Sequence, residues 1–451
     1  MENCKLPRDA LENCKLPRDA LIEILSRISV KGLMRFKCVC NFFYTLIKRD
    51  RDFIHKHYEI SRKKNDDFSV LELDASYCCL DGNYLYNLVY KESESDEIRR
   101  IKLDITNSRT RYVICCDGML CLIFGRGDMI IHYSDGTNLI FDILIWNPFT
   151  RETKNLPSVK VPAIKKPVKY WITNGFGFGL SKNMSWKIVM LWYFQYPHVE
   201  SKDSYEIVMV CSQIGDGSWG WRQIDEAPHV LVDSNKSFYL KGRYYWRSSG
   251  SSGPIIRQRR LVWFDFSDEI FGIIEFPSHS NVASVTIMND NIALLSCRGY
   301  GKVGDCIEIW LMNGNASNIY WHKHASIDCT RSIDYHKYWT LKGNWNEVWK
   351  PIGIWKLGGR DQLLVCPGYE GHRSDNKNKG FIAYVISIDL VTQEWKFVYL
   401  TRDGRTINIL SNSAGFVQVC SETNSALGPI CIFPNVPIYA RAFSESLKLL
   451  Q

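Results

Sequence analysis

The chain has 451 residues, of which 45% are hydrophobic and 23% charged, and its formal net charge is +8 at pH 7. This composition excludes a disordered chain and allows one large β domain with a smaller module, since a domain usually holds roughly 100–200 residues. The modest positive charge permits an acidic partner, and because the basic residues are scattered we expect no nucleic-acid binding.

No apolar stretch is long enough to cross a membrane, because a spanning helix needs about 20 residues. The chain begins with charged residues and a proline instead of an apolar segment, so we expect no secretory signal and no membrane partner. Sixteen cysteines are then expected to be reduced thiols in the cytoplasm, or also in the nucleus. Because they form no CxxC pair, the sequence predicts no metal site and no cofactor.

A ten-residue segment, ENCKLPRDAL, occurs at residues 2–11 and again without change at 12–21. Only the second copy continues into an apolar helical pattern, because Pro17 interrupts any helix that starts in the first copy. We therefore interpret residues 1–15 as an N-terminal extension.

Residues 16–55 show a helical pattern. After Pro17, a favourable first helical position, apolar residues lie on one helical face at Leu21, Ile24, Leu25 and Ile28. A second apolar stripe comprises Leu33, Phe36, Val39, Cys40, Phe43, Leu46 and Ile47. Two short helices cannot bury such faces within about 40 residues, so we expect them to dock on the rest of this chain or on another protein. Residues 56–67 are predicted to be a charged linker.

Residues 68–440 consist of short β-rich runs separated by turn signals, which is typical of a sandwich, barrel or propeller. Pairing the hairpins predicts five four-stranded units, at about 112–157, 172–225, 237–277, 284–327 and 350–400. The hairpins at 68–90 and 407–419 would join as a sixth unit and close a ring without free edges. We predict a mainly β fold with a six-bladed, propeller-like domain, and an open two-sheet sandwich is the alternative. Residues 441–451 are expected to be a C-terminal tail.

Several motifs have a simple structural interpretation. The glycine-rich run at 175–179 leads into a strand instead of a helix, so we interpret it as a β-turn region and not as a phosphate loop. His322 and His324 are expected to be half-exposed strand residues without a third metal ligand. The acidic run at 92–97 is expected to be a solvated loop, with recognition of a basic partner as the alternative. No GxSxG motif or recognisable nucleophile occurs, so no catalytic residues are predicted.

Residues 16–47 resemble an F-box. They read LPRDALIEILSRISVKGLMRFKCVCNFFYTLI and depart from the usual pattern at Ser29, Asn41 and Phe43, which replace proline, lysine and tryptophan. The resemblance implies that this segment binds a Skp-family adaptor and, through it, a cullin-RING ubiquitin ligase. The implied adaptor-binding residues are Leu16, Pro17, Leu21, Ile24, Leu25, Ile28, Leu33, Phe36, Val39, Cys40, Phe43, Leu46 and Ile47.

The rest of the chain resembles the plant F-box-associated domain. The resemblance is carried by CCDGMLC at 115–121, WNPFTR at 146–151, GFGF at 175–178 and FDFSDEIF at 264–271. The stretches MRFKCVC at 34–40 and FYTLI at 43–47 look most like the S-locus F-box proteins of the nightshade type.

These resemblances imply a non-catalytic substrate receptor of a Skp-cullin-F-box (SCF) ubiquitin ligase. The S-locus resemblance further implies that the target is a non-self S-RNase in pollen self-incompatibility. The alternatives are a receptor for an unrelated plant protein and a glycan-binding β module or hidden hydrolase. The sequence does not indicate which residues contact the target.

Overall fold

The computed structural model describes residues 16–63, 68–74, 85–91, 98–103, 110–116, 119–126, 140–147, 150–160, 171–195, 204–215, 217–248, 260–277, 282–298, 306–315, 318–328, 348–357, 360–368, 384–400, 407–408 and 420–421. The predicted extension at 1–15, the acidic run at 92–97 and the predicted tail at 441–451 lie outside these residues. None of the helices in the described residues has the length and apolar character needed to span a bilayer.

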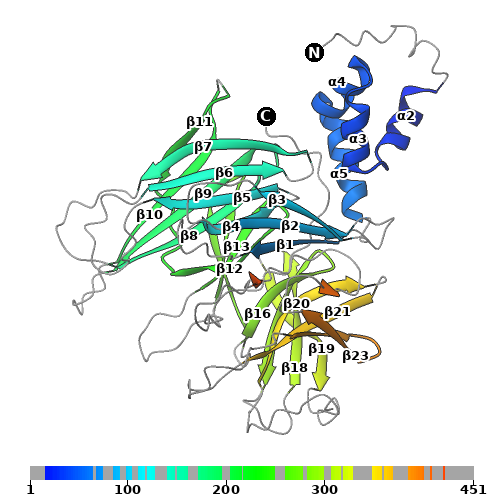
Figure 1. The fold of residues 1–451 in the computed structure, drawn as a ribbon. Helices are drawn as coiled ribbons and strands as arrows, with labels where there is room; N and C mark the ends of the chain where they lie inside the picture. Colours follow the sequence, from blue (N-terminus) through cyan, green and yellow to red (C-terminus); the bar gives the residue numbers. More distant parts are fainter. Residues whose placement is uncertain are drawn as a thin grey trace, which may run out of the picture.

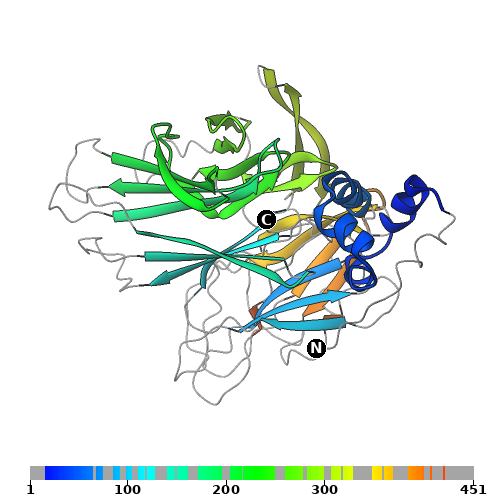
Figure 2. The same ribbon diagram turned by 90° about the horizontal axis from the view of Figure 1, so that it is seen from above.

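A helical module precedes the strands and lies to one side of them (Figures 1 and 2). Its helices are α2 (Arg18–Leu25), α3 (Val30–Phe36), α4 (Asn41–Arg49) and α5 (Arg51–Lys63). One buried cluster holds them together, composed of Leu25, Val30, Leu33, Leu46, Ile47, Phe53 and Ile54.

The helices differ from the prediction in two respects. The second apolar stripe forms two helices and not one, because the chain turns after Phe36 and starts α4 at Asn41. A continuous helix would hold Leu33 and Leu46 about 20 Å apart, whereas the turn brings both into the same cluster. Much of the predicted linker at 56–67 is also wrong, because α5 runs on to Lys63. Its turn at His57 and Tyr58 is buried, so this polar-looking segment has an apolar face.

The remaining described residues form six separate sheets. Sheet 1 contains β1 (Phe68–Asp74), β2 (Leu85–Lys91), β3 (Ile98–Leu103) and β25 (Cys420–Ser421). Sheet 2 contains β4 (Thr110–Cys116), β5 (Met119–Arg126), β6 (Ile140–Asn147) and β7 (Glu152–Lys160). Sheet 3 contains β8 (Trp171–Leu180), β9 (Trp186–Gln195), β10 (Ser204–Gln213) and β11 (Trp219–Ile224).

Sheet 4 contains β12 (Val232–Leu240), β13 (Arg243–Ser248), β14 (Arg260–Asp265) and β15 (Phe271–Glu275). Sheet 5 contains β16 (Val282–Met288), β17 (Asn291–Arg298), β18 (Cys306–Asn315) and β19 (Asn318–Asp328). Sheet 6 contains β20 (Val348–Leu357), β21 (Arg360–Gly368), β22 (Tyr384–Asp389), β23 (Trp395–Leu400) and β24 (Ile407–Asn408). The first strands of sheets 2 to 6 contact one another in chain order, as the inner strands of a propeller do.

The predicted fold class, a small helical module followed by a mainly β, propeller-like domain, is confirmed. Sheets 2 to 6 correspond to the five predicted units. Sheet 1 is built differently from the expectation, because β3 supplies a strand that the sequence did not reveal and β24 joins sheet 6. The late part of the chain still reaches sheet 1, since Leu73 and Asp74 pair in parallel with Cys420 and Ser421.

The glycine-rich run at 175–179 makes room for close packing between sheets 3 and 4. Gly175, Gly177 and Gly179 lie at alternate positions of β8 and therefore on one face of it. A Cβ atom on Gly177 would lie 2.8 Å from Cζ2 of Trp246 and 2.9 Å from the ring of Tyr244. The Trp246 indole Nε1–H donates to the Phe176 carbonyl at 2.9 Å, which locks the two sheets together. The run lies within a strand, so the interpretation as a turn is wrong.

Candidate functional site

The structure divides the thirteen predicted adaptor-binding residues by their exposure. Leu25, Leu33, Leu46 and Ile47 are 0–3% exposed and form the core of the helical module. These side chains hold the helices together and present no surface to a partner. Leu21, Ile28, Cys40 and Phe43 are half-buried.

The other predicted residues are apolar and exposed. Leu16 is 51% exposed, Ile24 49%, Val39 45% and Phe36 37%, and Pro17 is also exposed. Exposed apolar side chains on so small a module indicate a binding surface when they occur together. We call the set Leu16, Pro17, Ile24, Phe36 and Val39 the apolar face.

Tyr44, which is 37% exposed on α4, is absent from the predicted set. The Arg49 guanidinium lies 5.9 Å from the centre of the Tyr44 ring, which is within the range of a cation–π contact. Tyr44 lies outside the apolar stripe from which the binding residues were predicted. Its position directly after Phe43 is the sequence signal that could have added it to the set.

Local contacts fix the shape of this surface. Ser29 caps α3, because its hydroxyl accepts a hydrogen bond from the Gly32 N–H at 3.3 Å. The serine that replaces the usual proline therefore starts the helix by a different means. Phe43 packs against Phe36 and Phe42, with ring centroids 5.5 and 5.6 Å apart. Phe43, which replaces the usual tryptophan, therefore keeps an aromatic ring in contact with these two side chains.

Polar contacts hold α2 and the turn after it against α5. His57 is 1% exposed, and its Nε2 lies 2.9 Å from the Ile28 carbonyl oxygen in the turn that follows α2. Glu23 on α2 pairs with Lys56 on α5 and with Arg27. The hydrogen bonds from Lys56 and then Arg27 lower the pKa of Glu23 to about 2. These contacts keep α2 in place, so that Ile24 stays on the outside.

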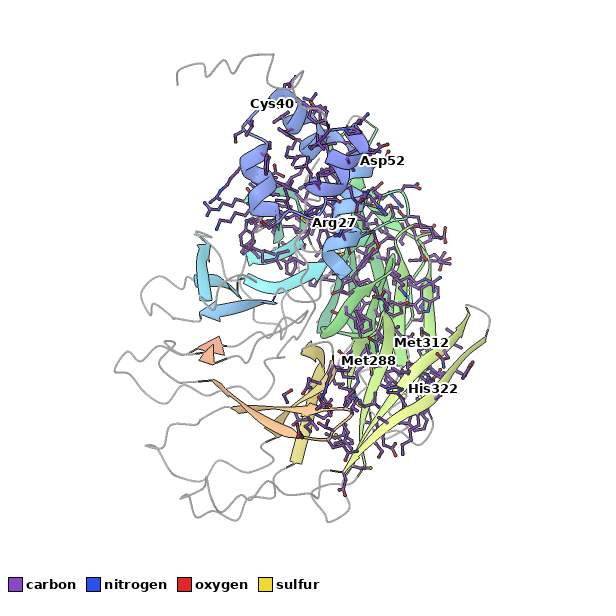
Figure 3. The ribbon with its side chains drawn as sticks, turned by 90° about the vertical axis from the view of Figure 1, so that its right-hand side faces the viewer. Arg27, Cys40, Asp52, Met288, Met312 and His322 are labelled. Atoms are coloured by element: carbon purple, nitrogen blue, oxygen red, sulfur yellow. The ribbon has the colours of Figure 1, made fainter. Side chains whose placement is uncertain are left out.

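The Val39 side of the apolar face lies away from the strands. Figure 3 places Cys40, which directly follows Val39, at the end of the helices away from the strands. Lys48 makes the contact with the β domain by pairing with Glu152 at the start of β7. A partner on the Val39 side would therefore not have to displace the β domain.

The turns between third and fourth strands explain two of the motifs that resemble the F-box-associated domain. Asn147, Asp265 and Asp389 each end a third strand and accept N–H groups of the following turn. The fourth residue after each is left-handed, with φ of 60° at Arg151, 56° at Glu269 and 57° at Gln393. The WNPFTR and FDFSDEIF motifs therefore encode the same turn in sheets 2 and 4, and sheet 6 repeats it.

The described residues bring together no catalytic group. Cys121 and Cys211 are fully buried, and burial raises the pKa of Cys211 to about 12, which keeps this thiol protonated. His322 is half-buried and bonds Asn313, whereas His324 is exposed on the same strand. Figure 3 shows His322 on the β18–β19 hairpin, far from the helical module.

Comparison with known families matches both parts of the chain. The F-box associated beta propeller domain matches residues 86–347, which is more than half of the chain, and the F-box domain matches residues 13–55. The chain belongs to the F-box-associated β-propeller family. It is a plant-type F-box protein, and an F-box implies binding of a Skp-family adaptor and assembly into an SCF ubiquitin ligase. Proteins of this family generally act as substrate receptors and not as catalysts.

Relatives of this F-box protein occur in Arabidopsis thaliana. The putative F-box/kelch-repeat protein At3g17570 is 24% identical over 68% of this chain and 75% of its own length. The putative F-box protein At3g10430 is 26% identical over 61% of this chain and 66% of its own length. Among solved structures, the β-propeller domain of the Trilobed protease from Pyrococcus furiosus aligns with a TM-score of 0.34 at 8% identity, over 79% of this chain and 83% of that one. That likeness is too distant to support a functional conclusion.

Proposed function

We propose that the apolar face of this F-box protein binds the Skp-family adaptor while the β domain binds the target, so that the chain brings the target to the ubiquitin-transfer machinery. The observation that carries the proposal is the exposure of Leu16, Ile24, Phe36 and Val39 on a module whose core is otherwise complete. Each side chain is about half exposed, so covering it contributes roughly 1 kcal/mol. The chain performs no chemistry, and its contribution is proximity.

The charged side chains on the α3 and α4 side of the apolar face favour an acidic partner. Arg35 and Lys31 are exposed on α3 next to Phe36, and Arg49 lies beside Tyr44. Charges of one sign around an apolar centre increase the association rate with a partner of opposite sign. We therefore expect the adaptor surface that meets α3 and α4 to carry carboxylates.

The proposed target is a non-self S-RNase. Support comes from the residues at 34–40 and 43–47, which look most like the S-locus F-box proteins. The experiment is co-expression of the full chain with a Skp-family adaptor, followed by binding of purified S-RNases to the complex. Co-purification of the adaptor without binding of any S-RNase would leave the receptor role in place and direct the search to another plant protein.

A further inference from the structure

A basic surface lies where the helical module meets sheet 2. Lys48 near the end of α4 pairs with Glu152 at the start of β7, and Figure 1 shows this end of sheet 2 turned toward the helices. Arg49 directly follows Lys48, and Arg151 in the β6–β7 turn directly precedes Glu152. Both arginines are exposed, so the ion pair brings two exposed guanidinium groups from distant parts of the chain into one region.

Each side of this junction holds a cation against an aromatic ring. On α4, the Arg49 guanidinium lies 5.9 Å from the centre of the Tyr44 ring. On the β domain, the Lys154 ammonium lies 5.7 Å from the centre of the Trp219 ring, and both distances are within the range of a cation–π contact. These contacts restrict two long side chains before a partner arrives, which lowers the entropic cost of binding. We call the set Tyr44, Arg49, Arg151, Lys154 and Trp219 the junction surface.

The described neighbours do not neutralise the two arginines of the junction surface. Among the residues that the structure describes, no carboxylate pairs with Arg49 or Arg151. Asp50 directly follows Arg49, but its carboxylate pairs with Arg18 instead. The carboxylate of Glu152 is already engaged across the junction. An acidic partner would therefore gain two arginine contacts without displacing a carboxylate of the described chain.

Carboxylates fit the junction surface better than nucleic acid does. An arginine presents a planar fork of N–H donors that matches a carboxylate in charge and geometry. Proteins that bind single-stranded nucleic acid stack bases on aromatic faces, whereas Tyr44 and Trp219 each have a face covered by a cation of this chain. We propose that the junction surface binds an acidic segment of the protein that the β domain recruits. This inference rests on the proposed function.

The position of the junction surface suits such a segment. Tyr44 lies one turn before Lys48 on the same side of α4, because residues four apart in a helix are neighbours. Figure 3 places Cys40, one turn further from Lys48, at the end of the helices away from the strands. The adaptor and an acidic segment could therefore bind together, with Arg49 at the border between them. A segment held by both units would also keep the helical module against the β domain.

The test uses the full chain purified with its adaptor and three labelled probes of equal length, heptaglutamate, heptaglutamine and heptauridylate. Fluorescence anisotropy at about 50 mM salt should show heptaglutamate binding with a Kd on the order of 0.1 mM, a weak affinity typical of a few exposed ion pairs. The affinity should fall at least fivefold at about 300 mM salt, because salt screens exposed charges. Heptaglutamine should bind at least tenfold more weakly than heptaglutamate, since it lacks the charges.

Arg49→Gln and Arg151→Gln should each weaken heptaglutamate binding about threefold, and together about tenfold, because each exposed ion pair contributes modestly. The double variant should keep its melting temperature and show a flatter dependence of affinity on salt, which a merely structural change would not produce. The matched control combines Lys160→Gln with Lys182→Gln. It removes the same charge from exposed positions at the far end of β7 and in the β8–β9 turn, and should bind like the wild type.

Equal binding of heptaglutamate and heptaglutamine, or equal binding by the wild type and the double arginine variant, would overturn the proposal. A similar loss in the lysine control would also overturn it, since the net charge would then explain the binding. Tighter binding of heptauridylate than of heptaglutamate would assign the surface to nucleic acid and not to an acidic protein. Adaptor recovery from the same preparations reports separately on the proposed function. Adaptor recovery without heptaglutamate binding would contradict the junction surface alone, whereas heptaglutamate binding without the adaptor would support the surface and contradict the receptor role.

Discussion

Lys48 of α4 forms an ion pair with Glu152 of β7, 104 residues further along the chain, and thereby joins the helical module to sheet 2. Both side chains are about one quarter exposed, and the second carboxylate oxygen of Glu152 is buried without a hydrogen-bond partner among the described residues. In a receptor that works by proximity, the angle between adaptor and target depends on such a contact.

We expect Lys48→Glu and Glu152→Lys each to destabilise the module–domain contact by about 1 kcal/mol, because each leaves like charges facing one another. The double variant should recover most of the loss. A double-mutant cycle on chemical unfolding of the full chain measures the coupling. Additive effects of the two changes would show that the side chains do not interact.

Gly177→Ala should destabilise the β domain by about 1–3 kcal/mol, the usual effect of overpacking a filled core. The added methyl group would meet the rings of Trp246 and Tyr244, which cannot move without disturbing sheet 4. Gly215→Ala is the matched control, because nothing lies within 4 Å of its added Cβ. Urea unfolding followed by tryptophan fluorescence compares the two, and equal stabilities would refute the tight packing at Gly177.

The neighbouring residues Ile24 and Leu25 should respond differently to truncation. Leu25→Ala removes a side chain that is 2% exposed and should cost about 2–5 kcal/mol in the module. Ile24→Ala removes one that is 49% exposed and should cost no more than about 0.5 kcal/mol. Loss of the helical circular-dichroism signal on heating reports the difference. A larger loss of stability in Ile24→Ala than in Leu25→Ala would contradict the assignment of Leu25 to the core-facing side of α2.

Acid should weaken the turn at Asp265. Burial raises the pKa of this carboxyl group, but hydrogen bonds from Arg243 and from the N–H groups of Ser267 and Asp268 outweigh burial and hold the pKa below its ordinary value of 3.8. A lowered pKa in the folded state means that the carboxylate contributes stability above pH 3.8, and that this contribution is lost as the pH falls further.

Asp265→Asn should therefore fold, because Asn147 fills the corresponding position in sheet 2. Its unfolding free energy should fall less steeply than that of the wild type as the pH drops below about 3.8. Asp268→Asn is the control, since the Asp268 side chain is 59% exposed and, among the described residues, its carboxylate has only a long contact with Lys182. If the unfolding free energy of Asp265→Asn fell with acid as steeply as that of the wild type, the role assigned to the Asp265 charge would be contradicted.

The sequence predicted the five later sheets well because turn residues mark their hairpins directly. Lys241 and Gly242, and likewise Asn289 and Asp290, adopt the positive φ angles expected of such turns. It failed for β3, where IRRIKL at 98–103 has an irregular pattern and gains strand structure only by pairing with β2. The part of α5 beyond residue 55 was predicted to be a linker because its charged residues obscure the apolar positions that face the module core.

The candidate site was predicted as a set of residues but not as a surface. Periodicity placed Ile24 and Leu25 on one stripe, and only the packing of α2 against α3 and α5 separates the exposed side chain from the buried one.

The most direct test of the receptor role is the affinity of the full chain for a purified Skp-family adaptor, measured with Val39→Asp and Ile24→Asp. Both side chains are exposed, so the variants should remain folded and lose at least 100-fold in affinity, because each buries a charge in an apolar contact. Ile273→Asp changes a similarly exposed side chain on β15 and should bind like the wild type. Unchanged affinity in folded Val39→Asp and Ile24→Asp would contradict the assignment of the apolar face to the adaptor.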